Sequence, residues 1–533
     1  MISKWLFRNN SKNSNTQQER GKQLSAAANN QKITAHEIPL PKNLHKKVNI
    51  LKPYLESNAD IIYRVFSLRG LPERQVGMIY LSGVIDNDTL KQHVLKPLIT
   101  GDWGELEQIP SKSLLDQIYR NLLTVGVVKK LNSPANLIQA IFDERAVLMV
   151  DGITEALALD IRGGDQRSIE EPPTEQTMRG SREGFNENLT SNTALIRRRL
   201  RDPNLVVENT IVGKRSRTDV AIFYIKDIAD PKIVATVRER LAKINIDGVL
   251  ATGYLEQMIE DNPYSLFPQA KGTERSDKVA AGLLEGRIAI LASGTPFALL
   301  VPSLFVEFFQ APEDYYERAF VGSLYRVLTF LSFFLAVSLP ALYVALFSFQ
   351  IELIPFELMV PLARARKQVP FPVVVEVLLL EGVMQLIITA GLRLSSPLNQ
   401  TVGVVSGIVI GQAAITAKLA TPGVIIMIAL ATICTFGIPS HTLSMATRLI
   451  RLPVTLLSAG FGMFGFSFSW LIIIAHLANL ESIGVPYLAP FAPTRYEDLK
   501  DSIFRTFFRK LKQRPASVPI QDRQRQGNMQ RKR

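Results

Sequence analysis

Six arginines are concentrated in the stretch TMRGSREGFNENLTSNTALIRRRLRDPN, which runs from Thr177 to Asn204. Guanidinium groups bind carboxylates and carbonyl oxygens, often through two parallel hydrogen bonds. From Asn186 to Arg201 the apolar residues recur at helical spacing, which predicts a helix whose arginines radiate toward neighbouring parts of the chain. An exposed charged helix with ordinary surface ion pairs is the alternative, and composition alone favours it. The arginines are Arg179, Arg182, Arg197, Arg198, Arg199 and Arg201.

The sequence shows no catalytic motif that these arginines could serve. The sequence has no nucleophile with a nearby base, no phosphate-binding glycine loop and no metal-ligand cluster. Its single cysteine, Cys434, excludes an intramolecular disulfide. We therefore predict a protein that is not an enzyme and that carries no cofactor or metal.

The net charge of +13 is unevenly distributed along the 533 residues. Residues 1–50 hold nine Lys or Arg against two Asp or Glu, and residues 495–533 hold twelve against four. A basic excess confined to flexible ends beside a hydrophobic region suggests attraction to anionic membrane lipids. A nucleic-acid groove would instead carry its Lys and Arg on a folded face, so we expect no nucleic-acid partner.

The regions of the chain before and after the arginine-rich stretch alternate strand and helix patterns, and the second region repeats the first. The segment RAVLMVDGITEAL (Arg145–Leu157) aligns with RIAILASGTPFAL (Arg287–Leu299), and Met78–Leu98 resembles Ala221–Leu241 as a strand, a turn and a helix. Two modules repeated in the same order predict two related α/β subdomains rather than one sheet. We interpret Gly294-Thr295-Pro296 as a hairpin turn of the second subdomain.

Long apolar stretches dominate the chain after about residue 321. Four of them contain no Lys, Arg, Asp or Glu, and each is long enough to cross a hydrocarbon core of about 30 Å. The four predicted spans are Val327–Ile351, Leu394–Ala417, Leu419–Thr447 and Leu452–Leu480.

A fifth apolar segment, Pro370–Gly391, carries Glu376 and Glu381. If it crosses the membrane, the count is five and the basic C-terminal tail leaves the cytoplasm, against the positive-inside rule. We therefore prefer an interfacial or re-entrant helix and four spans. In either case both carboxylates should face water, protein or an aqueous cavity, because a charge at the bilayer centre is costly.

Glycines recur every four residues at Gly403, Gly407 and Gly411, followed by Gln412. Such a small-residue face lets helices approach closely, within one subunit or between copies of the chain. An amide at this depth must bind a neighbouring helix or line a wet path. We take this helix as the candidate core of an oligomeric pore, with Val404, Ile408 and Ile415 as possible hydrophobic gate residues.

Several long motifs resemble the A subunits of GerA-type nutrient germinant receptors of endospore-forming bacteria. They are EPPTEQTMRGSREGFNENLTSNTALIRRRLRDPNL, GTPFALLVPSLFVEFFQAPEDYYER, RKQVPFPVVVE, IVIGQAAI and GVPYLAPFAP. The resemblance covers roughly residues 79–493. It implies a protein of the inner spore membrane that acts with a transporter-like B subunit and a lipoprotein C subunit, and that forms an oligomeric, nutrient-gated ion channel.

The same resemblance marks part of the arginine-rich stretch as a family signature. We hypothesise that this signature couples the orientation of the subdomains to the membrane half. Its residues are Arg179, Gly180, Arg182, Glu183, Gly184, Phe185, Arg197, Arg198 and Arg199.

The sequence thus predicts a membrane protein with two related cytoplasmic α/β subdomains, a helical membrane domain of four to five spans and a basic tail. The alternatives to a germinant-gated channel subunit are a non-conducting scaffold or signal-transducing subunit of the same receptor and a secondary transporter. The expected parts are a disordered basic tail (1–50), subdomain 1 (51–165), an arginine-rich linker (166–205), subdomain 2 (206–320), the membrane domain (321–482) and a basic cytoplasmic tail (483–533).

Overall fold

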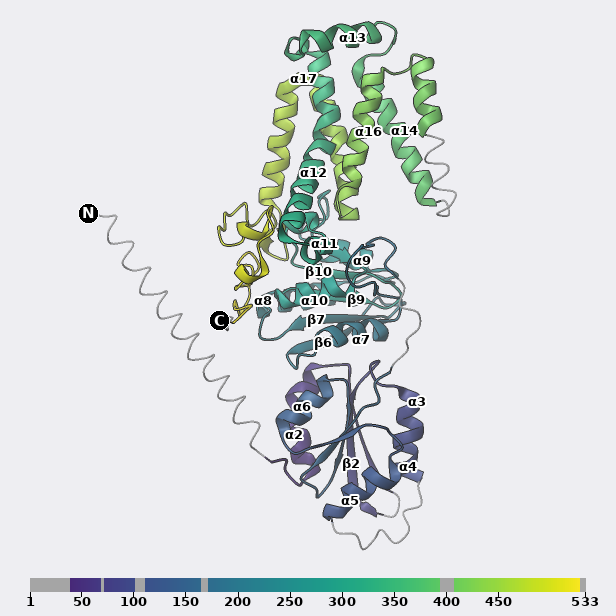
Figure 1. The fold of residues 1–533 in the computed structure, drawn as a ribbon, viewed down its shortest axis with the longest axis vertical. Coiled ribbons are helices and arrows are strands. Elements are labelled where there is room, and N and C mark those ends of the chain that lie inside the picture. The colour runs from purple at the N-terminus through teal and green to yellow at the C-terminus, as the bar shows by residue number, and fades with distance from the viewer. Residues whose placement is uncertain (1–38, 69–70, 101–110, 164–170, 394–406, 528–533) are drawn as a thin grey trace, which may run out of the picture.

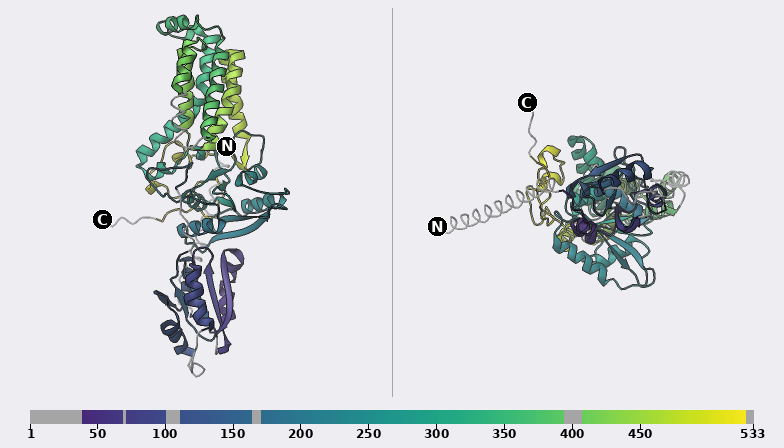
Figure 2. Two further views of the ribbon diagram at one scale, coloured as in Figure 1. Left: turned by 90° about the vertical axis from the view of Figure 1, so that its right-hand side faces the viewer. Right: turned by 90° about the horizontal axis from the view of Figure 1, so that it is seen from below.

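A computed structural model describes residues 39–68, 71–100, 111–163, 171–393 and 407–527. Two α/β units lie one above the other, and a bundle of helices continues from the second unit along the same axis (Figure 1). We call the units subdomain 1 and subdomain 2. Figure 2 shows the same arrangement from two further directions.

Subdomain 1 is built on an antiparallel sheet whose described strands have the order β1-β2-β4-β5-β3. Helices α2 and α6 cover one face, where Leu51 and Ile141 are buried. A continuous helical segment formed by α3, η1 and α4 covers the other face together with α5 and η3. The strands are β1 (Ile61–Leu68), β2 (Leu71–Leu81), β3 (Val128–Leu131), β4 (Ala146–Val150) and β5 (Ala156–Leu159). The helices are α2 (Leu44–Ser57), α3 (Asn87–Thr89), η1 (Leu90–Leu95), α4 (Lys96–Thr100), α5 (Ser111–Gln117), η3 (Ile118–Leu122) and α6 (Pro134–Phe142).

Subdomain 2 repeats this plan, with its described strands in the order β6-β7-β9-β10-β8. Helices α8 and α9 pack on one face and helices α7 and α10 on the other. The strands are β6 (Leu205–Val212), β7 (Thr218–Ile225), β8 (Lys271–Thr273), β9 (Ile288–Ala292) and β10 (Ala298–Val301). The helices are α7 (Leu189–Arg199), α8 (Pro231–Lys243), α9 (Thr252–Ile259) and α10 (Ser276–Leu284).

The duplication predicted from sequence is confirmed at the level of strands. The repeated segment forms the hairpin β4–β5 in one subdomain and the hairpin β9–β10 in the other, both antiparallel. Gly294, at the turn between β9 and β10, has a φ of 86°, which a glycine adopts without strain. Every residue of these four strands is buried, which explains their continuous apolar runs.

Both predicted tails differ from their expected form in the described residues. Helix α2 begins at Leu44, inside the segment expected to be disordered, because its apolar face packs on the first sheet. The C-terminal segment packs on subdomain 2: Val518 is buried in its core, Ile520 contacts that core, and Gln521 donates to the carbonyl of Ala229 at 2.6 Å. A few apolar residues among many basic ones give no periodic signal, so the sequence did not reveal this docking.

The helical bundle begins after subdomain 2. Helices α12, α14 and α17 are, among the described residues, long and apolar enough to cross a membrane. The helices are α11 (Pro312–Tyr316), α12 (Ala319–Ser348), α13 (Phe356–Arg366), α14 (Val373–Arg393), Gly407–Thr416, α16 (Pro422–Phe436) and α17 (His441–Asn479). The remaining short elements are η4 (Phe305–Phe309), η5 (Ile351–Leu353), β11 (Glu481–Ser482), β12 (Val485–Pro486), η6 (Leu499–Asp501) and η7 (Phe508–Lys510).

Helix α17 doubles back at Gly462, whose φ of 61° and ψ of −140° are not helical. A straight helix of 39 residues would be about 57 Å long. Instead, Leu443 and Leu477, near its two ends, lie in one hydrophobic cluster with η4 of the soluble part. Gly462 lies at the other end of the bundle, against Phe349 just after α12. The helix is therefore an antiparallel hairpin.

The observed helices differ from the four membrane spans predicted from the sequence. The stretch Leu419–Thr447 is not one helix, because α16 ends at Phe436 and α17 begins at His441. Leu452–Leu480 is not one straight span either, because of the turn at Gly462. The segment Pro370–Gly391 contains α14, which is long and apolar enough to cross a membrane, whereas we preferred an interfacial or re-entrant helix there. The first part of Leu394–Ala417 lies outside the described residues.

Candidate functional site

The arginine-rich stretch forms a connector, residues 171–204, that contacts both subdomains and the start of the helical bundle. Its helix α7 begins at Asn188, whose side chain accepts hydrogen bonds from the backbone N–H groups of Thr190 and Ser191. This N-cap satisfies two donors that the first helical turn leaves free. The helix fixes the directions of the consecutive residues Arg197, Arg198 and Arg199, which differ by about 100° per residue.

Arg197 anchors the connector to subdomain 1. Its guanidinium donates from Nε and Nη2 to both carboxylate oxygens of Asp60 and from Nη2 to Oδ1 of Asn58 at 2.7 Å. Nη1 donates to the carbonyl of Leu205 at 2.8 Å, and the group lies 5.4 Å from the ring centre of Phe142. Only 1% of the Arg197 side chain is exposed. An exposed helix with surface ion pairs, the alternative that composition favoured, is therefore wrong for this residue.

The next two arginines point to other partners. Arg198 donates to the carbonyl of Gly163 in subdomain 1 at 2.6 Å. Arg199 donates to Ser276 Oγ of subdomain 2 at 2.8 Å, and it also binds Ser181 and Glu183 of the connector itself. Three consecutive arginines thus fix helix α7 to both subdomains and to its own preceding loop.

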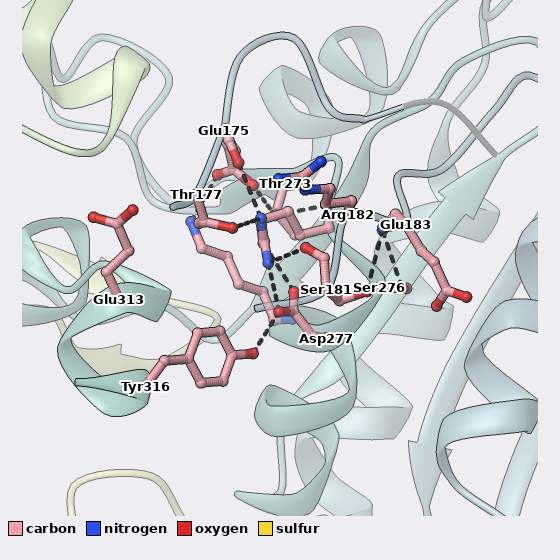
Figure 3. Close-up of polar contacts among 12 residues, drawn as sticks. Glu175, Thr177, Ser181, Arg182, Glu183, Thr273, Ser276, Asp277, Glu313 and Tyr316 are labelled. Atoms are coloured by element: carbon pink, nitrogen blue, oxygen red, sulfur yellow. Dashed lines mark hydrogen bonds and ion pairs between the residues drawn. The ribbon is translucent and has the colours of Figure 1, made fainter. Parts of the chain in front are cut away.

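Arg275, which the sequence did not single out, lies at the centre of the connector's contact with subdomain 2. Figure 3 shows its partners Glu175, Thr177, Ser181 and Asp277. Its guanidinium donates to the carbonyls of Glu175 and Ser181 and to Thr177 Oγ1, at 2.8 to 3.1 Å. It also forms a two-point pair with Asp277 at 2.7 and 3.0 Å. A lone arginine before a helix carries no motif, so only the folded chain reveals its role.

Asp277 extends this network toward the bundle. Tyr316 Oη of α11 donates to Asp277 Oδ2 at 2.5 Å. Burial alone would raise the pKa of the Asp277 carboxyl, but the hydrogen bonds from Arg275 and Tyr316 hold that pKa below its ordinary value. Burial and the bond to Asp277 raise the pKa of Tyr316 to about 12. The carboxylate and the phenol therefore keep their charged and neutral forms at neutral pH.

The connector also touches α11, which leads directly into α12. Gly180 has a φ of 138°, and a Cβ added there would lie 2.6 Å from Cε2 of Tyr316. Nearby, the N–H of Met178 donates to Glu313 Oε1 at 2.9 Å, and Arg179 lies 4.0 Å from Glu317. The close approach of Gly180 requires the absence of a side chain.

The remaining signature residues divide between buried and exposed positions. Gly184 pairs with Arg275 as an isolated antiparallel bridge, and Phe185 is buried between α7 and the second sheet. Arg182 is 74% exposed and lies 3.9 Å from Glu171, so it belongs to the surface rather than to the network. The fold brings together most of the signature but leaves Arg179 and Arg182 largely in solvent.

A second buried charge cluster fixes the base of α12 to the C-terminal segment. Arg326 is fully buried and binds Asp314 of α11 at 2.9 Å and Asp501 at 3.0 Å. Tyr315 Oη donates to the same Asp501 at 2.9 Å, and Arg505 donates to the carbonyl of Tyr315 at 3.0 Å. The C-terminal segment therefore supports the same α11–α12 junction that the connector contacts.

The two membrane-helix carboxylates face protein. Glu376 Oε2 accepts from the N–H of Thr421, where α16 begins, at 3.0 Å. Glu381 lies 3.1 Å from Nε of Arg451 on α17, and both side chains are at most 8% exposed. Pairing within the bundle is one of the environments that we expected for them.

The glycine-rich helix is open along its small-residue face. Gly403 and Val404 lie outside the described residues. A Cβ added at Gly407 or Gly411 would meet no other atom within 4 Å, and Ile408 is 67% exposed. The side chain of Gln412 is also exposed. The positions of Gly407 and Gly411 are therefore open, whereas Ala414, further along the same helix, is buried against the bundle.

Cavities separate the connector from the bundle. One of about 260 Å³ is lined by Glu175, Lys271 and His441, and one of about 420 Å³ by Thr177, Glu313 and Phe436 among others. Glu175 and Lys278 pair at 2.7 Å in the walls of both. Among the described residues no group of three or more His, Cys, Asp or Glu could hold a metal ion.

Comparisons with known proteins identify spore germination proteins as relatives of this chain. The profile of the Bacillus/Clostridium GerA spore germination protein family matches residues 49–517. Spore germination protein KA of Bacillus subtilis (strain 168) is 40% identical over 92% of this chain and 89% of its own length. Spore germination protein GerLA of Bacillus cereus is 38% identical over 91% and 97%. A crystal structure of the N-terminal domain of the A subunit of the Bacillus megaterium spore germinant receptor GerK3 matches 50% of this chain and 98% of that domain, at 31% identity and a TM-score of 0.41.

Proposed function

The chain belongs to the GerA family of spore germination proteins, and we propose that it is the A subunit of a nutrient germinant receptor, forming an oligomeric ion channel that nutrients open. Its place is the inner spore membrane, with both subdomains on the cytoplasmic side. Its partners are a transporter-like B subunit and a lipoprotein C subunit, as the family resemblance implies. Its task in germination is to release ions in response to the nutrient.

The connector is the element that couples the subdomains to the bundle. It reaches Asp60 in subdomain 1 through Arg197, Ser276 in subdomain 2 through Arg199, and Tyr316 on α11 through Gly180. A rotation of one subdomain against the other would strain this continuous set of contacts. Because α11 leads into α12, the strain would reach the first long helix of the bundle, as coupling through packed and hydrogen-bonded contacts requires.

The open face of Gly407–Thr416 is the observation that carries the oligomeric channel. Gly407 and Gly411 leave room for another backbone, and Gln412 exposes an amide that lipid cannot satisfy. A Cβ added at Gly407 or Gly411 meets no atom of the described chain, which supports packing between copies at these two positions. In a ring of subunits that pack through Gly407 and Gly411, the neighbouring Ile408 would face the axis and close the ion path by dewetting.

Conductance in planar bilayers tests the proposal. The purified full chain, alone and with its B and C subunits, is incorporated at equal density, and current is recorded with and without nutrient. We expect cation current that depends on this chain and, in the complete receptor, on nutrient. Absence of current from a correctly assembled receptor would reject the channel and leave a non-conducting signal-transducing subunit.

A further inference from the structure

An exposed apolar patch covers α9 and the loops on either side of it. Helix α9 buries Leu255 and Ile259 against subdomain 2. Large apolar side chains on its other face and in its flanking loops remain exposed, and Tyr264 is 95% exposed. We call these residues the α9 patch: Leu250, Tyr254, Met258, Tyr264 and Leu266. Contiguous exposed apolar surface of this kind marks an interaction site more often than chance placement does.

The patch lies at the level where α17 ends. Ser265, next to Tyr264, is hydrogen-bonded to Nε2 of His476 at 2.9 Å, one turn before the end of α17. Above it on α17, Leu471 and Ile474 are exposed in the same way. Figure 1 places α9 at the end of subdomain 2 nearest the helical bundle. The loop that carries Tyr264 therefore lies against the last turn of α17.

The patch segment itself carries no basic side chain, although the turn from Lys214 to Arg217 lies beside its first loop. Between Lys243 and Lys271 the sequence contains no Lys or Arg. Two of its acidic residues are already paired, Asp247 with Arg215 at 3.6 Å and Asp261 with Arg240. Tyrosine combines an apolar ring with a polar hydroxyl, which suits the boundary between headgroups and acyl chains.

We propose that the α9 patch rests in the headgroup region of the membrane that α17 enters and holds subdomain 2 against the membrane surface. The proposal uses the membrane assignment of α17 and is independent of ion conduction. The occupant is the lipid surface itself, recognised through apolar and aromatic side chains rather than through charge. The hydrogen bond from Ser265 to His476 fixes the height of the patch relative to the bundle.

Quenching by spin-labelled lipid tests this contact in the full chain. In a Cys434→Ser background, single cysteines are introduced as Tyr264→Cys, Ile474→Cys and Val127→Cys and labelled with a nitrobenzoxadiazole fluorophore. The protein is reconstituted into nanodiscs of phosphatidylcholine, with and without a fraction carrying a doxyl group near the headgroup. Val127 is a matched control because it is apolar, 51% exposed and in subdomain 1, away from the bundle.

We expect the Tyr264 label to lose emission to a degree comparable with the Ile474 label, while the Val127 label keeps its emission. The loss should persist at high salt, because the side chains of the patch are apolar and aromatic rather than basic. A Tyr264 label that is unquenched beside a quenched Ile474 label would overturn the proposal, whatever the wavelength of its emission. If the Ile474 label is also unquenched, the membrane assignment of α17 fails and the proposal fails with it.

Discussion

Arg197 donates two hydrogen bonds to the carboxylate of Asp60, from Nε to Oδ2 at 2.8 Å and from Nη2 to Oδ1 at 2.9 Å. The two residues are 137 positions apart, and their side chains are 1% and 6% exposed. Water therefore screens this pair little, and helix α7 is held in one orientation against subdomain 1. Because Arg197 fixes the orientation of α7, it also fixes the direction in which Arg199 reaches subdomain 2.

Removing Arg197 should destabilise the soluble part strongly. Arg197→Ala leaves Asp60 buried without its charge partner, and breaking a buried pair in this way costs about 3–5 kcal/mol. Urea unfolding of a fragment covering residues 39–310 measures the loss. Arg215→Ala removes a pair with Asp247 in which both side chains are largely exposed, and should cost at most about 1 kcal/mol. Equal losses for the two variants would mean that burial of Arg197 is unimportant.

Gly180→Ala should uncouple nutrient sensing from channel opening. The new methyl group would lie within 3 Å of Tyr316, at a backbone angle that alanine rarely adopts, so the connector must move away from α11. We expect receptor at normal level in spores but a slower response to nutrient, measured as release of ions and loss of optical density. Gly126→Ala is the control, since its Cβ meets no atom within 4 Å. A normal response from both variants would argue against the coupling role.

Glu256 should make the stability of subdomain 2 depend on pH. Burial, with a smaller contribution from Glu260, raises the pKa of Glu256 to about 7. A raised carboxyl pKa stabilises the folded chain below the unfolded pKa near 4.5 and loses that contribution as pH rises to about 7. Glu256→Gln should therefore match the parent near pH 4.5 and be more stable near pH 8.

The gain expected for Glu256→Gln near pH 8 is about 1–2 kcal/mol, less than the full shift implies because the side chain is partly exposed. Thermal unfolding of the full chain in detergent at both pH values measures it as a few degrees. Glu239→Gln is the control, because Glu239 is exposed on α8 beside Lys243. A gain that is equal at both pH values would exclude titration of Glu256 as the cause.

The glycine-rich helix should give opposite phenotypes for two kinds of substitution. Ile408→Ala replaces a large apolar side chain at the proposed constriction by a small one, which widens the ion path and should cause ion leak or germination without nutrient. Val404→Ala should have the same effect. Gly407→Leu should push subunits apart and remove the receptor from the membrane. Ile433→Ala on α16 is a matched control, since Ile433 and Ile408 are 65% and 67% exposed. Normal behaviour of all these variants would end the assignment of this helix to a pore.

The turn at Gly462 should be accessible from the side of the membrane opposite the subdomains. Gly460 is exposed near this turn, whereas Gln526 is held near subdomain 2 by the docked C-terminal segment. In intact cells, an impermeant maleimide should label Gly460→Cys and reach Gln526→Cys only after permeabilisation. Labelling of both from outside, or of neither, would contradict the hairpin topology.

The sequence by itself determined those elements in which the order of apolar and polar residues shows which side chains are buried. The duplicated hairpins β4–β5 and β9–β10 read as continuous apolar runs because all of their residues are covered, and helix α7 is apparent from its apolar spacing. The apolar half of the chain is equally evident. In each case the signal lies within a single element, so the residues that carry it are neighbours in the sequence.

Only the tertiary structure decided where charges are buried and where helices turn. Arg197 resembles its neighbours Arg198 and Arg199 in sequence, and it differs because Asp60 comes from another subdomain. Gly462 resembles other glycines of the bundle, and its backbone conformation alone shows that α17 reverses direction. Because we missed that reversal, we counted Leu452–Leu480 as one span, and this count was our ground for preferring an interfacial or re-entrant helix at Pro370–Gly391. Neither a pairing between distant residues nor the dihedral angles of a single residue produces a periodic pattern in the sequence. Only the three-dimensional structure therefore shows them.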